Sequence, residues 1–460
     1  MAFYAKEEKF PLMTLEEVLE GEEGDIEENY KEFVNPYLVK MLGLIGFNKS
    51  FVRAEGTKVW DNTGTQYVDF LGGYGALNLG HNPRAILEAI KKVMDRPNIL
   101  QAALNPIAAA LAKNIAAITP GELRMTFFSN SGAEAVEGAI KTARAATGRK
   151  KLLYCEGSFH GKTLGALSIT GREKYRTPFQ PLLEDVFQVS FGDMESLKNA
   201  LAGEAVAAFI LEPIQGEGGI IVPPEGYLQQ ARTLCDRSGT LLIVDEVQTG
   251  FGRTGKLFAC EHENIVPDIL CLAKSLGGGV MPIGATVAKE SVWNRAYGSM
   301  EKCLLHTSTF GGNSMAAAAG MAALQEVYEQ GLVEQSNQKG KYFIDRLKNL
   351  QKEYPIIKDV RGKGLMIGLE FHTMGGVFKK LSEEYVGALV AGELLNRYGL
   401  ITAYTLNNPN VIRLEPPLII TYEEIDYMVD ALEAICKRHK NFFSLALGGS
   451  KKMIGRFIRG

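Results

Sequence analysis

From about residue 125 onward, short runs of apolar residues alternate with amphipathic helical stretches, and this alternation restricts the fold more than any other feature of the chain. A run that is apolar throughout is typical of a strand covered by helices on both faces. Strands that alternate with helices build βαβ units and a mostly parallel sheet. The predicted strands are Met125–Phe128, Lys151–Tyr154, Ala207–Leu211, Thr240–Val244, Ile269–Leu272 and Ile283–Val287.

The two ends of the chain have a different texture. Alternating apolar and polar residues at 57–70 surround Asn62, Thr63 and Gly64, which is typical of a β-hairpin. Between about 335 and 440, long charged helical stretches flank strand-like runs, which predicts a smaller α+β domain. The expected division is an N-terminal segment 1–70 that contributes to the small domain, a large domain 71–340, and a C-terminal small domain 341–460 that ends in a basic tail.

Composition excludes several classes of protein. Of 460 residues, 46% are hydrophobic and 22% are charged, and the formal net charge is −3, so neither a disordered chain nor a broadly basic nucleic-acid binder is expected. The apolar runs fall far short of the ~18 residues that a membrane-spanning helix needs. Six scattered cysteines are typical of a cytoplasmic protein. Cys260 and His262 lack a second pair at zinc-ligand spacing, so we expect no metal site.

A glycine pattern at Gly250–Gly255 matches the dinucleotide-binding fingerprint G-x-G-x-x-G and follows a strand-like run. In a dinucleotide-binding protein that fingerprint opens a helix. Residues 256–265, however, show no helical stripe before Pro267. We therefore do not expect a nicotinamide cofactor.

Three other segments place polar groups beside an apolar run. Ser129–Arg144 begins a helix whose first turn offers free N–H groups to a phosphate, although a plain capped helix has the same pattern. Asp245 and Glu246 end a buried strand, where a carboxylate needs a cationic partner. Lys274 ends another apolar run; it either reaches solvent or is a desolvated amine of lowered pKa that can form a Schiff base.

Each of these segments is ambiguous alone, but together they describe one kind of site. Pyridoxal phosphate needs a lysine for its aldehyde, an acid for its pyridine nitrogen and donors for its phosphate. A strand-end lysine, a strand-end acid and a helix N-terminus on one α/β sheet supply all three. The sequence therefore predicts pyridoxal 5′-phosphate as the cofactor.

Six blocks of the chain resemble those of class III aminotransferases, which are fold-type I pyridoxal phosphate enzymes that handle terminal amines. The blocks follow the family's order and span most of residues 40–430. The resemblance implies a large domain with a mostly parallel, seven-stranded sheet and a smaller α+β domain. Within the family, the likeness is greatest to the putrescine aminotransferases. The blocks are Ser129–Arg144, Phe159–Leu164, Leu211–Gly219, Leu241–Gly255, Asp268–Gly279 and His306–Asn313.

The resemblance also implies roles toward the cofactor. Lys274 is expected to form the covalent link and to move the proton during catalysis, and Asp245 to pair with the pyridine nitrogen. Gln248 is expected to bond the ring oxygen, and Phe159 to stack on the ring. The remaining expected cofactor-binding residues are Ser131, Gly132, Ala133 and His160, with Ala133 standing where many relatives have a threonine.

Substrate and partner contacts follow from the same resemblance. Arg413 is expected to bind the carboxylate of 2-oxoglutarate, and Glu217 to cover it when an amine occupies the site. Thr309 is expected to reach the phosphate of the partner subunit, which makes the active unit a homodimer or a tetramer made of two dimers. Lys162 stands where ornithine and acetylornithine aminotransferases have an arginine that holds an α-carboxylate; lysine lacks the bidentate fork.

The replacement at Lys162 favours a diamine donor over an α-amino acid. The expected reaction moves an amino group of putrescine to 2-oxoglutarate and gives 4-aminobutanal, which cyclises to 1-pyrroline, and glutamate. The alternative is an ornithine or acetylornithine aminotransferase. The same fold also supports aminomutases, which need no 2-oxoglutarate, and a carrier or regulator that holds the cofactor without turnover.

Overall fold

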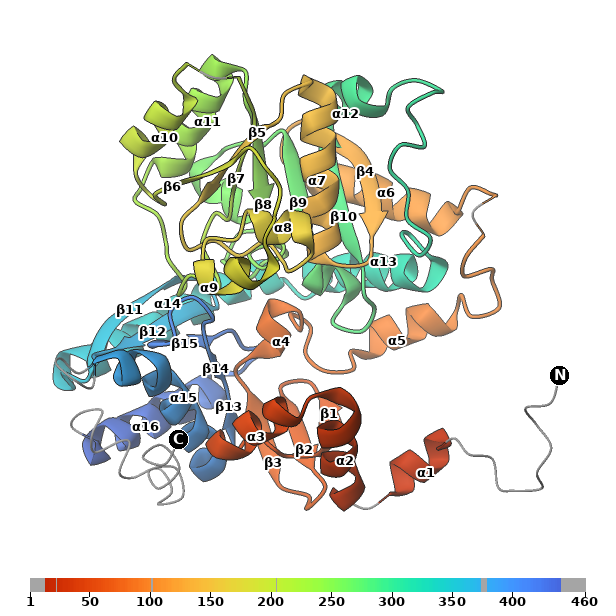
Figure 1. The fold of residues 1–460 in the computed structure, drawn as a ribbon. Coiled ribbons are helices and arrows are strands. Elements are labelled where there is room, and N and C mark those ends of the chain that lie inside the picture. The colour runs from red at the N-terminus through yellow and green to blue at the C-terminus, as the bar shows by residue number, and fades with distance from the viewer. Residues whose placement is uncertain (1–12, 22, 101, 204, 374–378, 440–460) are drawn as a thin grey trace.

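A seven-stranded sheet forms the centre of the larger part of the molecule (Figure 1). The structure is a computed structural model, and it describes residues 13–21, 23–100, 102–203, 205–373 and 379–439. Its order is β4-β10-β9-β8-β7-β5-β6, and β10 runs antiparallel to both of its neighbours while the pairs among β5 to β9 are parallel. The predicted mostly parallel, seven-stranded sheet is therefore confirmed. The strands are β4 (Leu123–Ser129), β5 (Lys151–Cys155), β6 (Val186–Val189), β7 (Val206–Leu211), β8 (Leu241–Asp245), β9 (Ile269–Leu272) and β10 (Gly284–Lys289).

Strand β6 is the one member of this sheet that the apolar runs did not predict. It lies at the edge of the sheet and pairs with β5 alone among the described strands. Phe187 and Gln188 are exposed, because no strand or helix layer covers that edge fully. A short strand with half its side chains in solvent lacks the continuous apolar run that identifies its buried neighbours.

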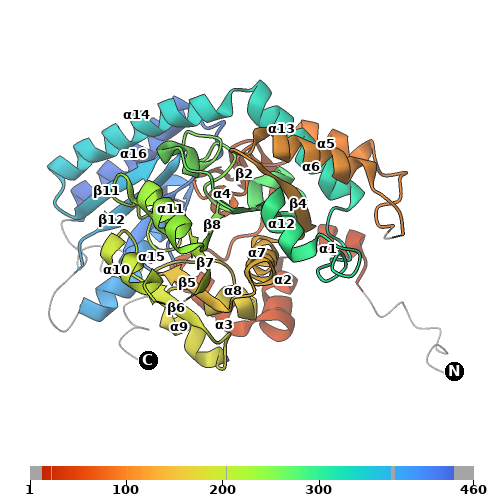
Figure 2. The same ribbon diagram turned by 90° about the horizontal axis from the view of Figure 1, so that it is seen from above.

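Helices cover both faces of the sheet and enclose two apolar cores. In the view from above, α6 and α13 lie on one side of β4 and α7 lies on the other (Figure 2). One core gathers side chains of α7 with the sheet, and the other gathers those of α6, α10, α11 and α13. These helices are α6 (Pro106–Ile118), α7 (Gly132–Thr147), α8 (Leu164–Ser168), α10 (Met194–Leu201), α11 (Tyr227–Ser238), α12 (Glu290–Tyr297) and α13 (Ser314–Glu329).

Two smaller four-stranded sheets complete the molecule. One has the order β11-β12-β15-β14; the other has the order β1-β2-β3-β13 and contains the hairpin predicted at 57–70. Strand β13 comes from residue 400 yet pairs with β3, so the N-terminal segment and the C-terminal part share a sheet. The division at residues 70 and 340 remains a prediction. The strands are β1 (Phe51–Glu55), β2 (Lys58–Asp61), β3 (Gln66–Asp69), β11 (Ile357–Lys363), β12 (Met366–Phe371), β13 (Leu400–Ile401), β14 (Ala403–Tyr404) and β15 (Val411–Leu414).

The remaining helices connect these sheets or pack on them. Three long C-terminal helices, α14 (Leu332–Glu353), α15 (Lys379–Tyr398) and α16 (Tyr422–Arg438), share a core with β11, β12 and β15, as their amphipathic patterns predict. The basic tail from residue 440 lies outside the described residues. The other helices are α1 (Leu15–Glu20), α2 (Glu23–Asn29), η1 (Tyr30–Val34), α3 (Pro36–Ile45), α4 (Gly72–Gly75), α5 (Arg84–Lys91), α9 (Glu173–Arg176), η2 (Thr177–Phe179), η3 (Ala259–Glu263) and η4 (Lys274–Gly277).

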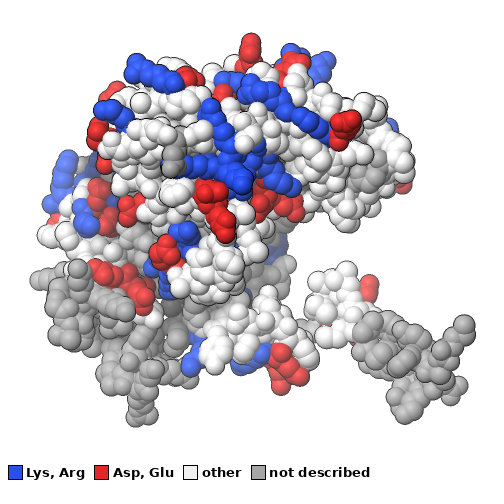
Figure 3. Space-filling view, turned by 45° about the horizontal axis from the view of Figure 1, so that its top comes forward, with Lys and Arg blue, Asp and Glu red and all other residues white. Residues whose placement is uncertain are grey.

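The surface charge and the cysteines of the described residues can be compared with the expectations from composition. Acidic and basic side chains both appear on the face drawn in Figure 3, in keeping with the net charge of −3. Within the described ranges, no helix has the length and apolar character needed to cross a membrane. All six cysteines are free thiols, and Cys303 is the exposed one. The cytoplasmic location remains a prediction.

Candidate active site

The three segments singled out by their polar chemistry meet at one edge of the large sheet. Strand β4 ends at Ser129 just before α7, β8 ends at Asp245, and Lys274 follows β9 closely. Because these three strands point the same way, their carboxyl ends share an edge, which is where ligands bind in open α/β sheets. The Gly250–Gly255 segment forms turns here and opens no helix, so it does not have the geometry of a dinucleotide fingerprint.

Lys274 is a strained residue in an acidic setting. Its backbone adopts φ +49°, in the left-handed region that side chains avoid, and such strain is found at functional sites. Burial lowers the pKa of its amine, while the charges of Glu415, Glu217 and Asp245 oppose that shift and Arg413 adds to it. Of the two alternatives left open by the sequence, the structure supports the desolvated amine.

Asp245 is held by two hydrogen bonds. Its Oδ1 accepts the N–H of Val247 at 3.0 Å, and its Oδ2 lies 2.7 Å from Nδ1 of His160. Burial lowers the pKa of His160, but the hydrogen bond and the negative charge of Asp245 outweigh burial, so that the net pKa is raised. The contact with Asp245 therefore favours the charged form of His160 at the end of β8. Nε2 of His160 is buried without a hydrogen-bond partner among the described residues.

Glu212 is a second buried carboxyl beside this pair, and the sequence analysis assigned it no role. It follows β7 directly and is only 5% exposed. Its two oxygens accept the N–H groups of Phe159 at 2.8 Å and of Gly216 at 3.0 Å. Burial raises its pKa to about 7, although the nearby His160 acts in the opposite direction. Glu212 thus ties the loop of Phe159 to the turn that precedes Glu217.

The start of α7 forms a narrow cradle of backbone groups. Ser131 is the N-cap, and its hydroxyl accepts the N–H of Glu134 at 3.2 Å. A Cβ added to Gly132 would come within 2.7 Å of a methyl group of Val247, so only glycine fits there. The N–H groups at the start of a helix have no partner within the helix and can bind a phosphate.

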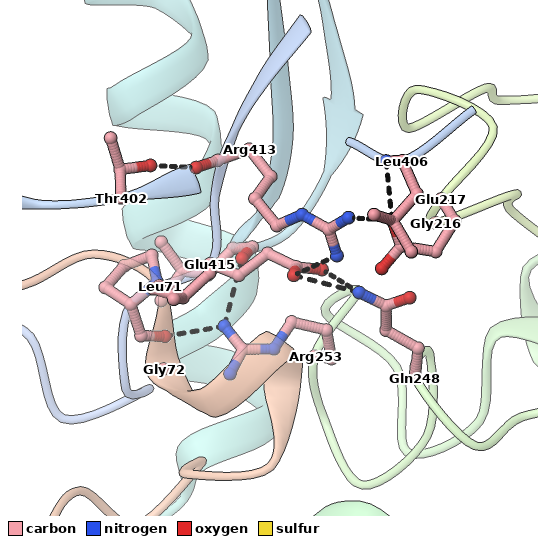
Figure 4. A network of polar contacts seen from close by, with 12 residues as sticks. Leu71, Gly72, Gly216, Glu217, Gln248, Arg253, Thr402, Leu406, Arg413 and Glu415 are labelled. Atoms are coloured by element: carbon pink, nitrogen blue, oxygen red, sulfur yellow. Dashed lines mark hydrogen bonds and ion pairs between the residues drawn. The ribbon is translucent and has the colours of Figure 1, made fainter. Parts of the chain in front are cut away.

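Arg413, Glu217 and Glu415 form a buried network across the site (Figure 4). Arg413 and Glu415 are fully buried, and Nη2 of Arg413 pairs with Oε2 of Glu217. Nη1 of Arg413 lies 3.6 Å from Oε2 of Glu415. The ring of Tyr74 covers the guanidinium at 5.1 Å from its centroid. Burial lowers the pKa of Arg413, but the charges of Glu217 and Glu415 raise it by more. The net pKa is therefore raised, and the guanidinium stays charged.

Gln248 lies between this network and the end of β8. Its amide nitrogen donates to both carboxylate oxygens of Glu415 at 2.9 Å. Its side-chain oxygen faces Gly216, where an added Cβ would come within 1.9 Å of it. The expected bond from Gln248 to a ring oxygen therefore remains a prediction, and Glu415 is the partner that the structure gives it.

Three other expected site residues, Phe159, Lys162 and Thr309, differ in how far they are buried. Phe159 is half-buried at the edge of the site, while Lys162 is exposed with its ammonium 5.3 Å from the ring centroid of Tyr175. Thr309 is exposed and lines a surface pocket, to which residues 98–100, 126–128 and 311–313 also contribute. The structure thus brings together Lys274, Asp245, His160, Glu217, Gln248 and Arg413, whereas Thr309 lines a pocket to which none of these six residues contributes.

A signal for the missed carboxylates exists in the sequence. Arg413 and Glu415 are two residues apart in an apolar strand and its continuation, so their side chains point to the same face and can pair. Glu212 follows the all-apolar strand β7 in the same way that Asp245 ends β8. An acid at the end of a buried strand is costly unless it is partnered, which identifies both positions.

Comparison with known proteins agrees with this geometry. The profile of the family described as "Aminotransferase class-III" matches residues 47–436. The chain is 41% identical to the aminotransferase PigE of Serratia sp. (strain ATCC 39006) over 459 residues, which cover 91% of this chain and 54% of PigE. The chain therefore spans about half the length of that relative.

Solved structures show the same likeness. The ornithine aminotransferase of Toxoplasma gondii ME49 superposes with a TM-score of 0.83 at 30% identity, covering 93% of this chain and 100% of that chain. An amine transaminase from an uncultivated Pseudomonas species, solved in its pyridoxal phosphate-bound form, gives a TM-score of 0.77 at 30% identity over 85% of this chain and 95% of that chain.

The residues at the strand ends fit pyridoxal phosphate. Lys274 offers an amine of lowered pKa, and Asp245 offers a carboxyl group fixed by His160. Gly132 opens α7, whose N-terminus supplies the kind of N–H groups that bind a phosphate. The donor set is thus an amine, a carboxylate and a helix N-terminus, as the cofactor requires.

A pH-dependent stability difference is expected between the wild-type chain and His160→Asn. Because the pKa of His160 is raised above 6.5 by folding, its stabilisation is complete below pH 6.5 and is lost as the pH rises through the folded-state value. Urea unfolding of the cofactor-free protein should therefore show a wild-type advantage that is larger at about pH 6 than at about pH 9.

His262 provides a control of opposite sign. Burial lowers its pKa to about 4, so its stabilisation is present above pH 6.5 and is lost as the pH falls. The advantage of the wild-type chain over His262→Asn should therefore not shrink toward high pH. An advantage over His160→Asn that stays constant across this range would contradict the charged His160–Asp245 pair.

Proposed function

Because the chain belongs to the class III aminotransferase family, whose members depend on pyridoxal phosphate, we propose that it transfers an amino group of putrescine to 2-oxoglutarate. The products are 4-aminobutanal, which cyclises to 1-pyrroline, and glutamate. The whole enzyme's activity is part of this proposal, because the chain spans only about half of PigE.

The main support for a diamine donor is the set of charged groups around Lys274. The carboxylates of Glu217, Glu415 and Asp245 raise the pKa of its amine, and Arg413, which acts on the amine in the opposite direction, is paired with Glu217. A second ammonium group suits such a setting, and an α-carboxylate does not. Lys162, at the position expected to hold an α-carboxylate, is exposed beside Tyr175.

Three groups of this chain would hold the cofactor. Lys274 would form the covalent link, the first turn of α7 at Ser131–Ala133 would hold the phosphate, and Asp245 would accept the pyridine N–H. When bound, pyridoxal phosphate supplies an electron sink that stabilises the carbanion formed at the amine-bearing carbon. Asp245 can fill its role because His160 and the N–H of Val247 hold its carboxyl group in place.

Lys274 is the proposed general base. Its lowered pKa leaves a larger fraction of the amine neutral, and a neutral Nζ can take the proton from the carbon that bears the amino group. A base works best when its pKa lies near the working pH, and burial moves Lys274 in that direction. The surrounding carboxylates stabilise the ammonium that forms.

Arg413 would bind a carboxylate of 2-oxoglutarate. Its guanidinium is buried and charged, which suits bidentate recognition of a carboxylate. Glu217 now occupies that position, so an acceptor carboxylate must displace it. With an amine donor in the site, Glu217 neutralises Arg413 and leaves no unpaired buried charge.

An ornithine or acetylornithine donor is the second candidate. It is supported by the likeness to the ornithine aminotransferase of Toxoplasma gondii and, at 32% identity and a TM-score of 0.73 over 88% of this chain and 99% of that chain, to the acetylornithine aminotransferase of Elizabethkingia anophelis. In that case Lys162 would have to turn away from Tyr175 to reach the α-carboxylate.

We also propose that the active unit is a homodimer. Two segments that meet at the pocket of Thr309 expose large apolar side chains, among them Leu104, which is 98% exposed, and Met300, which is 91% exposed. Contiguous exposed apolar surface of this kind marks an interface. In a symmetric dimer, Thr309 would then lie at the site of the partner subunit.

Light scattering tests the dimer. The wild-type chain should have twice the mass of one chain, and the double variant Leu304→Glu, Leu305→Glu should have the mass of one chain because it places charges on the exposed apolar surface. Phe187→Glu, at the opposite edge of the large sheet, is the matched control and should stay dimeric. A monomeric wild-type protein would refute the role of Thr309.

Replacing Lys274 tests the catalytic assignment. Lys274→Ala should lower turnover by roughly 10²- to 10⁴-fold or more, because the general base and the covalent link are both lost. Its circular dichroism spectrum should match that of the wild type. Lys198→Ala, an exposed lysine on α10, should keep full activity. Steady-state activity retained by Lys274→Ala would rule out the assigned role.

A single-turnover experiment tests the donor. The pyridoxal phosphate-loaded protein is mixed with putrescine, N-acetylornithine or ornithine in the absence of a keto acid, and the visible absorption of the bound cofactor is followed. We expect putrescine alone to abolish this absorption quickly. If only the amino acids do so, the ornithine or acetylornithine reaction replaces the putrescine reaction as the assignment.

A further inference from the structure

The loop at residues 405–410 holds Glu217 at two points. The N–H of Leu406 donates to Oε2 of Glu217 at 2.8 Å, and the N–H of Asn407 donates to the carbonyl of Glu217 at 2.9 Å. Figure 4 shows Leu406 and Arg413 on either side of the Glu217 carboxylate. The same carboxylate oxygen thus receives both a backbone N–H and the guanidinium.

Side chains anchor this loop to the large sheet's loops. Nδ2 of Asn407 donates to the carbonyl of Gly157 at 2.8 Å, and Arg172 donates to the carbonyl of Leu406. Within the loop, the hydroxyl of Thr405 donates to the carbonyl of Asn408 at 2.7 Å. These contacts of Thr405, Leu406 and Asn407 fix the position of the Leu406 N–H.

The loop also belongs to the hairpin that carries Arg413. It joins β14 to β15, and Arg413 is the third residue of β15. The donor at Leu406 and the guanidinium of Arg413 therefore sit on one rigid unit, and Glu217 is bound to both ends of it. Uncovering Arg413 means that the Glu217 carboxylate gives up the Leu406 N–H as well, which leaves that half-buried donor without its partner.

We propose that the backbone N–H of Leu406 is a specificity-determining group that retains Glu217 over Arg413. It favours donors that bring no carboxylate to Arg413, and it weakens the binding of dicarboxylate acceptors there. This inference rests on the proposed role of Arg413 as the acceptor's carboxylate site. A backbone group that contacts neither substrate would then set the balance between the two half-reactions.

Proline substitution removes this N–H selectively. Leu406→Pro lacks the donor, whereas Leu406→Ala keeps it and loses the same side-chain contacts. Thr405 is paired to Val411 in an extended segment, which is the conformation that a residue before proline prefers. Leu406 is not among the residues of positive φ, so its backbone does not conflict with a proline in that respect.

The measurement is the binding of glutarate, a dicarboxylate without a keto group, to the pyridoxal phosphate-loaded proteins by calorimetry. We expect the Kd of glutarate to be about five- to twentyfold lower for Leu406→Pro than for Leu406→Ala, and the Kd for Leu406→Ala to equal that of the wild type. The KM for 2-oxoglutarate should fall in parallel.

A second variant guards against a folding defect in the proline variant. Asn407→Ala keeps the Leu406 N–H but removes the anchor to Gly157, so it should lower the Kd of glutarate by about two- to fivefold. Thermal unfolding shows whether each variant is folded. Equal values of Kd in Leu406→Pro and Leu406→Ala, or an unchanged Kd in Asn407→Ala if the proline variant unfolds, overturn the proposal.

The outcomes also separate this inference from the proposed function. If the wild type transaminates putrescine with 2-oxoglutarate but the Kd of glutarate is insensitive to Leu406→Pro, the function stands and the retention of Glu217 fails. If Leu406→Pro binds glutarate more tightly and the wild type does not use putrescine, the retention stands and the donor assignment fails.

Discussion

A row of buried charges of alternating sign, Arg253, Glu415, Arg413 and Glu217, holds the two parts of the molecule together. None of the four is more than 6% exposed. Arg253 belongs to the loop after β8 and donates to the carbonyls of Leu365 and Pro416, while Arg413 and Glu415 come from β15 and its continuation. Buried charges persist only when they are paired, and breaking such a pair costs about 3–5 kcal/mol. The site therefore forms only when the C-terminal part docks on the large sheet.

The same row of charges determines the chemistry beside it. Burial alone lowers the pKa of the Lys274 amine, and the negative charges of Glu415 and Glu217 oppose that shift. Burial likewise lowers the pKa of Arg253 to about 10, and the neighbouring Glu415 limits the shift. One carboxylate thus serves the fold and the site, because Glu415 also accepts both hydrogen bonds from Gln248.

Much of the fold and part of the site could be predicted from the sequence because burial leaves a simple pattern. Strands covered on both faces are apolar throughout, so β4, β5, β7, β8, β9 and β10 were found, while the half-exposed edge strand β6 was not. Asp245 and Lys274 stood out because each ends such a run. Glu212 and Glu415 went unassigned because their importance depends on the backbone and side-chain partners that folding brings to them.

The sequence by itself determined the large, mostly parallel sheet, the residues at its strand ends and the family, since apolar periodicity and ordered motifs are local properties of the chain. Tertiary structure decided which of those residues contact one another and which buried charges surround them. The contact of His160 with Asp245 joins positions 85 residues apart, and that of Arg413 with Glu217 joins positions 196 apart. Electrostatic energy depends on distance and burial in space, which spacing along the chain does not fix. The protonation of the site is therefore a property of the folded protein.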